Sequence, residues 1–120
     1  MNRPTTIHRR RALFDEAVAI IENEYAQDLD LDRLARRVAT SRRQLQRVFN
    51  EIGGTSFRTH LARVRMRKAA EMLQSETTPV RDVAQSVGYR QPAQFAKAFR
   101  RHHGTPPSRF RGNAGAEMAA

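Results

Sequence analysis

Four polar side chains able to contact DNA bases recur at three- and four-residue steps within one short segment. They are Arg43, Gln46, Arg47 and Asn50, and on a helix this spacing places them along one face. An arginine can donate to both O6 and N7 of guanine, and a glutamine or asparagine can bridge N6 and N7 of adenine. The same stripe is also compatible with an ordinary solvated helix face, so the surrounding pattern has to decide between the two interpretations.

The charge of the chain favours a polyanionic partner. Its 120 residues include 22 Lys and Arg against 12 Asp and Glu, a formal net charge of +10 and a sequence pI of about 11.5, in the range of nucleic-acid binders. The chain has no cysteine, which excludes disulfides, thiolate zinc sites and a cysteine nucleophile. No segment is a run of about 20 apolar residues, and the N-terminus lacks the apolar region of a secretory signal.

Apolar periodicity predicts a series of amphipathic helices. The first covers about residues 8–26, and a short second one is capped by Asp30. A third opens at Ser41, which forms a capping box with Gln44, and it stops at a pair of glycines. The longest helix covers about residues 56–75 and is followed by a proline-containing break.

The apolar pattern of the second and third helices then returns later in the chain. The second copy follows the first by 49 positions before the turn and by 50 after it, so its turn has one extra residue. The series Leu31, Leu34, Ala35, Val38, Ala39, Leu45 and Phe49 is matched by Val80, Val83, Ala84, Val87, Gly88, Phe95 and Phe99. Small residues inside the first helix and at the turn are typical of a helix-turn-helix, where two short helices cross closely.

The second copy has fewer side chains that could read bases. Arg90 or Gln91 caps its second helix, which carries a proline in its first turn. The outward positions are Ala93, Ala96, Lys97 and Arg100, with Gln94 and Arg101 at the margins. Alanine can contact a thymine methyl group but donates no side-chain hydrogen bond. We therefore expect more reliance on phosphate contacts and DNA shape in this copy.

The length of the helix between the copies predicts how one chain could bind. About 20 residues give roughly 30 Å, close to the roughly 34 Å between successive major grooves on one face of B-DNA. Two non-identical units need no palindrome. We therefore expect a monomer on an asymmetric site of about two helical turns.

Over about Ala12 to Arg111 the chain resembles the AraC/XylS family of bacterial transcription regulators. The resemblance rests on the segments 31–35, 41–49, 65–73 and 83–89, and most specifically on the block 91–101 (QPAQFAKAFRR) followed by 104–111 (GTPPSRFR). The sequence departs from the family pattern at His103, where an aromatic core residue is common. The DNA-repair methyl acceptors with a related fold need a cysteine, which this chain lacks.

The resemblance implies an all-α fold of about seven helices, with two helix-turn-helix subdomains joined by a long linker helix. The subdomains are expected at 8–53 and 77–111, the linker helix at 54–76, and a disordered tail at 112–120. Taken with the stripes above, the expected base contacts are Arg43, Gln46, Arg47, Asn50, Arg90, Gln91, Pro92, Ala93, Ala96 and Lys97. The expected phosphate contacts are Ser41, Arg42, Arg65, Gln94, Arg100, Arg101 and Arg109.

The expected function is that of a sequence-specific regulator of transcription that binds double-stranded DNA and places two recognition helices in successive major grooves. The chain has no room for a separate effector domain, so it is similar to the stand-alone subgroup of MarA and SoxS. That subgroup implies a cytoplasmic monomer on the bacterial nucleoid, without cofactor or small-molecule effector, that activates by contacting RNA polymerase. The residues themselves leave activation or repression, the operator, and whether the chain is a complete protein or an excised domain open.

Three other classes of function differ from this one in the sequence features that they require. No catalytic or metal-binding motif is present: the four histidines lack metal-site spacing, and there is no phosphate loop or nucleophile elbow. A sequence-independent architectural or RNA-binding protein would share the charge, but the chain has no Trp and most aromatics lie on inward stripes. A protein-interaction module with arginine-rich faces is also compatible with the composition.

Overall fold

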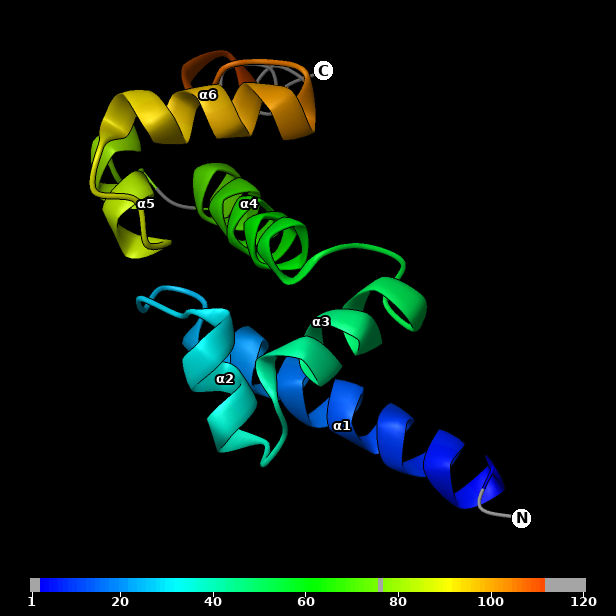
Figure 1. The fold of residues 1–120 in the computed structure, drawn as a ribbon. Coiled ribbons are helices and arrows are strands. Elements are labelled where there is room, and N and C mark those ends of the chain that lie inside the picture. Colours follow the sequence, from blue (N-terminus) through cyan, green and yellow to red (C-terminus); the bar gives the residue numbers. More distant parts are fainter. Residues whose placement is uncertain (1–2, 76, 112–120) are drawn as a thin grey trace. The chain divides into compact units, whose positions relative to one another are not determined.

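Helices make up all the regular structure of residues 3–75 and 77–111, the part of the chain that the computed structural model describes (Figure 1). The helices are α1 (Arg3–Glu24), α2 (Leu31–Arg37), α3 (Arg42–Glu51), α4 (Phe57–Ser75), α5 (Val80–Ser86) and α6 (Pro92–His103), followed by a helical turn over 107–111. This confirms the expected all-α fold of about seven helices. The tail expected at 112–120 lies outside the described residues. None of the described helices is long and apolar enough to cross a bilayer.

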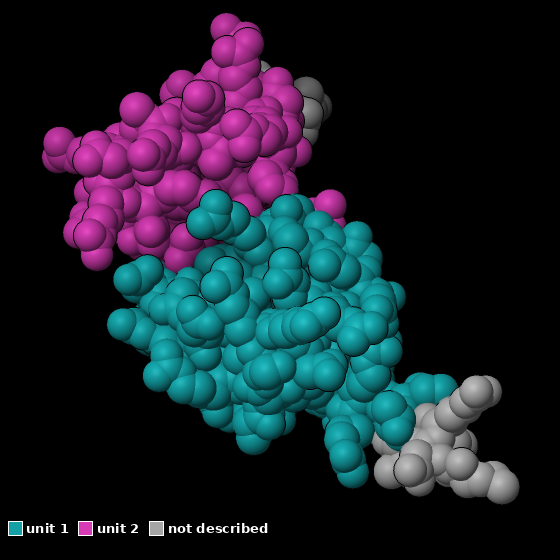
Figure 2. Space-filling view, in the orientation of Figure 1, with its two compact units in different colours: residues 1–61 teal, residues 62–120 magenta. Residues whose placement is uncertain are grey.

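The chain divides into two compact units, Met1–Leu61 and Ala62–Ala120 (Figure 2). The division falls within α4, so the first five residues of this helix belong to the first unit and the remainder to the second. The subdomain boundaries 8–53, 54–76 and 77–111 stay a prediction.

In the first unit, α1 packs against α3. Ala17 and Ile21 of α1 are fully buried, and the rings of Phe14 and Phe49 make a T-shaped contact with 5.4 Å between ring centroids. The helix begins at Arg3, earlier than the predicted residue 8, and ends at Glu24 rather than 26. Residues 6–9 of this helix are exposed, so apolar periodicity could not mark where the helix starts.

The predicted repeat is visible in the backbone hydrogen bonds of the two units. The amide of Thr40 donates to the carbonyl of Ala35 at 2.9 Å, and the amide of Tyr89 donates to Ala84 at the same distance. At the turn, Ala39 has φ 57° and Gly88 has φ 102°. Both values lie in the left-handed region, where a Cβ atom comes too close to the following carbonyl oxygen, so glycine is favoured and alanine adds only that one atom. The two turns are therefore built alike, which explains the small residue that each copy carries there.

The two second helices of the repeat begin differently. At α3, Oγ of Ser41 accepts a hydrogen bond from the amide of Gln44 at 3.1 Å, as the capping box predicts. At α6, Gln91 occupies the N-cap position without a side-chain hydrogen bond, and Pro92 follows in the first turn. Pro92 has no amide hydrogen to satisfy, so the start of α6 needs less capping.

The second unit has its own core around two buried phenylalanine rings. Phe95 and Phe99 of α6 are fully buried, as are Val83 of α5 and Ala69 of α4. Met66 is buried as well, although the apolar stripe expected for the long helix does not include it. That stripe comprises Phe57, Leu61, Val64, Ala69, Met72 and Leu73.

His103 takes part in the packing of this unit. Its ring lies 4.4 Å from Phe99 and 5.5 Å from Phe110, centroid to centroid, and Nε2 lies 3.2 Å from the carbonyl oxygen of Met66. The imidazole thus contributes a ring contact where the family commonly has an aromatic residue, and it ties the end of α6 to α4.

Ala84 provides a test of the close helix crossing, because it is 1% exposed and lies in α5, which packs on α6. Ala84→Leu should destabilise the protein by about 1–3 kcal/mol, since three added carbon atoms have no space to occupy. Thermal melting followed by circular dichroism measures the effect. Ala93→Leu, at an exposed position of α6, is the control and should leave the melting temperature nearly unchanged. Equal melting curves for the two variants would contradict the crossing.

The ion pair between the ends of α1 and α2 provides a test by pH. Nη1 and Nη2 of Arg37 donate to the two carboxylate oxygens of Glu24 at 2.6 and 2.7 Å, and these hydrogen bonds lower the pKa of Glu24 from its ordinary value. A lowered pKa in the folded state adds stability that is present above the unfolded pKa and is lost as the pH falls through the folded pKa. The melting temperature of Glu24→Gln should therefore lie below that of the parent chain at pH 7 and converge with it in acid. A gap independent of pH would contradict this role of the pair.

Candidate nucleic-acid interface

The face of α3 that points away from the core carries the predicted base-reading side chains. Leu45, Val48 and Phe49 are fully buried and hold the helix by its inner side. Side chains on the other side of the helix are exposed, and they comprise Arg43, Gln46, Arg47 and Asn50. Because the inner face is held tightly, the outer face has a defined orientation, which contacts with base edges require.

Arg47 has a carboxylate neighbour on its own helix. Nε of Arg47 lies 3.9 Å from Oε1 of Glu51, one turn further along α3. The other carboxylate oxygen, Oε2, accepts a hydrogen bond from Nη2 of Arg10 on α1 at 2.5 Å. The hydrogen bond and charge of Arg10, together with the charge of Arg47, lower the pKa of Glu51. Glu51 is therefore ionised at neutral pH and bridges two guanidinium groups.

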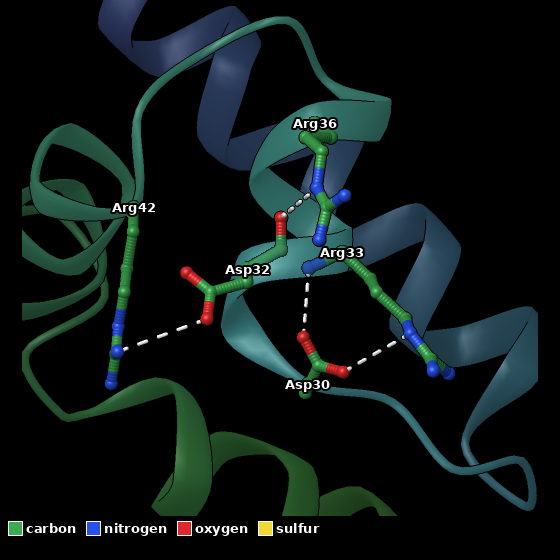
Figure 3. A network of polar contacts seen from close by, with 5 residues as sticks. All are labelled: Asp30, Asp32, Arg33, Arg36 and Arg42. Atoms are coloured by element: carbon green, nitrogen blue, oxygen red, sulfur yellow. Dashed lines mark hydrogen bonds and ion pairs between the residues drawn. The ribbon is translucent and has the colours of Figure 1, made fainter.

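Arg43, in contrast, has no ion-pair partner among the described residues. Arg42, at the start of α3, lies 3.8 Å from a carboxylate oxygen of Asp32 at the start of α2. Figure 3 shows the guanidinium of Arg42 directed toward this carboxylate. The two arginines at the start of α3 thus differ, since Arg42 has an acidic neighbour and Arg43 has none among the described residues.

The acidic neighbour of Arg42 belongs to a small polar network at the start of α2 (Figure 3). Asp30 caps the helix by accepting a hydrogen bond from the amide of Arg33 at 2.8 Å, and it also forms an ion pair with the Arg33 guanidinium at 3.3 Å. Nε of Arg36 donates to the backbone carbonyl of Asp32 at 3.5 Å. The carboxylate of Asp32 is left to face Arg42, so the cap of α2 and the start of α3 are joined electrostatically.

The corresponding face of α6 has smaller side chains and carries fewer hydrogen-bonding groups. Ala93 and Lys97 are exposed, whereas Ala96 is half-buried. The predicted contacts that flank them are all exposed, and they comprise Arg90, Gln91, Pro92, Gln94, Arg100 and Arg101. The helix contains no acidic residue, and its last turn carries Arg100, Arg101, His102 and His103. This face suits close approach to a polyanion more than recognition by side-chain hydrogen bonds.

Two further predicted phosphate-contacting arginines lie elsewhere in the second unit. The guanidinium of Arg65 lies over the ring of Tyr89, 5.8 Å from its centroid, and is half-buried. Burial raises the pKa of the Tyr89 hydroxyl, against the opposing charges of Arg65 and Arg101. The Tyr89 hydroxyl is thus neutral at physiological pH. Arg109 is exposed on the last helical turn.

Two acidic residues that lie within ion-pair distance of arginines on α3 were not among the predicted contacts. Glu51 stands four residues after Arg47, and this spacing is a signal that could have found it. Asp32 contacts Arg42 through the fold, and neither residue type nor spacing indicates that contact. No group of three or more His, Asp or Glu side chains in residues 3–75 and 77–111 is arranged to hold a metal ion.

Comparison with known proteins agrees with this geometry. The family described as "Helix-turn-helix domain" matches residues 34–113. The solved DNA-binding domain of AdpA, described as a global transcriptional factor in complex with a target DNA, superposes with a TM-score of 0.80 and is 30% identical. That alignment covers 87% of this chain and 94% of the AdpA domain.

Two other relatives give the same result. The C-terminal domain of AraT, a response regulator from Geobacillus stearothermophilus, has a TM-score of 0.82 at 32% identity and covers 84% of each chain. The lactose operon transcription activator of Staphylococcus xylosus is 30% identical over 79% of this chain, which spans 34% of the activator.

The chain spans between 25% and 36% of the length of four further curated regulators that it matches. The whole activity of such longer proteins does not follow from this part of them. The matched family, the shared fold and the exposed face of α3 agree, and the members of this family are DNA-binding regulators of transcription and not enzymes. The chain belongs to the AraC-type helix-turn-helix family.

Proposed function

We propose that this chain binds a specific site on double-stranded DNA through α3 and α6, each placed in one of two neighbouring major grooves. The observation that carries the proposal is the face of α3, where Arg43, Gln46, Arg47 and Asn50 are all exposed above a fully buried inner side. These side chains can distinguish bases by their hydrogen-bonding patterns in the major groove. A helix-turn-helix presents its second helix to that groove.

The two helices would contribute unequally to recognition. On α3 the base-contacting side chains are arginine and amide groups, and Ser41 and Arg42 at its start would contact phosphate. On α6 the corresponding positions are Ala93, Ala96 and Lys97, with Arg90 and Gln91 just before them. The phosphate contacts of this unit would come from Arg65, Gln94, Arg100, Arg101 and Arg109, all but Arg65 exposed.

The regulatory role would be activation in the cytoplasm, on the nucleoid, by a monomer that contacts RNA polymerase. The name of the matched lactose operon protein, a transcription activator, supports activation. The two non-identical recognition helices in one chain support a monomer, because they match an asymmetric site without a second copy.

A sequence-independent architectural protein is the alternative, and a salt titration separates it from the proposal. A duplex selected from a random pool should bind about a thousandfold or more tighter than a scrambled duplex of equal length, at each salt concentration where both can be measured. Fluorescence anisotropy gives both dissociation constants. The selected duplex should also be protected from nuclease over about two helical turns. Equal affinity for both duplexes would identify the architectural binder.

The proposed role of Arg47 predicts a position-specific loss. Arg47→Ala should weaken binding of the selected duplex by about 1–3 kcal/mol and remove the preference at one base pair. The measurement is a set of dissociation constants for single base-pair variants of the selected duplex. Arg109→Ala is the matched control, because a lost phosphate contact weakens all duplexes alike. An unchanged base preference in Arg47→Ala would contradict its role in base contact.

A further inference from the structure

Glu51 is in an unusual position for an acidic residue, because it lies on the helix that is to approach a polyanion. Its side chain is half-exposed and follows the exposed stripe of α3 by one residue. A carboxylate there would repel phosphates and lower general affinity for DNA. Its two oxygens are nevertheless both used, one by Arg10 at 2.5 Å and the other facing Arg47 at 3.9 Å.

The contact with Arg10 is built into the packing of α1 on α3. Arg10 precedes Phe14 by one helical turn, so the two side chains lie on the same face of α1. Phe14 lies against Phe49 and also very close to Gly53, where an added Cβ would come within 2.8 Å of the ring. This close approach places Arg10 beside the last residue of α3. The Arg10 side chain is only 33% exposed, so the anchor is more restricted than a freely solvated arginine.

The effect of Glu51 on Arg47 is expected to be twofold. An ion pair four residues along a helix reduces the number of rotamers that the long arginine side chain samples, which lowers the entropy lost on binding a base. The carboxylate also cancels part of the guanidinium charge. A partly neutralised arginine contributes less to the salt-dependent attraction that any duplex exerts. Its directional hydrogen bonds to a base then account for a larger share of the binding free energy that it provides.

We propose that Glu51 is a positioning residue for Arg47: anchored to α1 by Arg10, it orients the Arg47 guanidinium toward a base and limits its attraction to phosphate. This proposal rests on the proposed function, since it assumes that Arg47 contacts a base. It assigns a role in DNA selectivity to a residue that does not itself touch DNA, and through Arg10 it extends that role to α1.

The test measures selectivity and affinity separately in the full chain. Two duplexes are compared: the selected duplex, and one that differs from it at the single base pair for which Arg47→Ala loses its preference. The base preference is the dissociation constant of the changed duplex divided by that of the selected duplex. In Glu51→Gln this ratio should fall by about threefold or more, while binding of a scrambled duplex stays equal or becomes tighter. Glu71→Gln, the same chemical change at an exposed position of α4, is the control and should leave the ratio unchanged.

The anchor is tested by Arg10→Met, which keeps the length of the aliphatic side chain. The base preference should fall in this variant too. The double variant Arg10→Met with Glu51→Gln should lose no more base preference than Glu51→Gln alone, because both changes interrupt the same series of contacts from Arg10 through Glu51 to Arg47. A merely structural role would lower affinity for every duplex without changing the ratio.

Each result has one meaning for the proposal. If Glu51→Gln retains the parent ratio, or if Glu71→Gln reduces it equally, Glu51 does not position Arg47, and the proposed function stands unaffected. If Arg10→Met retains the ratio, Glu51 is not anchored by α1. If Arg47→Ala itself loses no base preference, the assumed role of Arg47 fails, and the proposal for Glu51 fails with it.

Discussion

The close crossing of two short helices is the constraint on which both units depend. It requires a residue no larger than alanine where the helices meet, and Ala35 and Ala84 are buried at these places. It also requires the backbone to turn through the left-handed region, which Ala39 and Gly88 do. Once these conditions are met, one face of α3 or α6 is fully buried and the opposite face is presented outward. The ability to contact DNA is thus a consequence of tight packing elsewhere.

Most of the fold could be predicted from the sequence because its main signals are local or repeated. The Ser41 cap, the apolar stripes and the offset of about 49 residues between the copies all depend on residues close in sequence or on self-similarity. The predicted start of α1 is wrong, since the exposed residues 6–9 show no buried apolar period that could mark it. The burial of Met66 was missed because it lies beside arginines in a stretch that looks like a polar face.

The candidate site could be predicted only in part, for a similar physical reason. Residue types that contact bases are recognisable in the sequence, and α3 indeed exposes them. The contacts that orient them join residues far apart, such as Arg10 and Glu51, which are separated by 41 positions. No periodicity links such residues, because their meeting depends on how α1 packs on α3. The sequence therefore indicates the groups that can act, and tertiary structure determines which of them are held in place.

Gly53 has no Cβ atom, and this limits which mutations the protein tolerates at that position. A Cβ at this position would meet the carbonyl oxygen of Phe49 at 2.7 Å as well as the ring of Phe14, so any larger residue acts as a wedge between two helices. Such a residue would move α1 away from α3 and so separate Arg10 from Glu51. With Glu51 in its proposed role, DNA selectivity would then fall although no residue that faces the duplex has changed. In a mutational scan scored on operator choice, position 53 should then behave like a recognition residue.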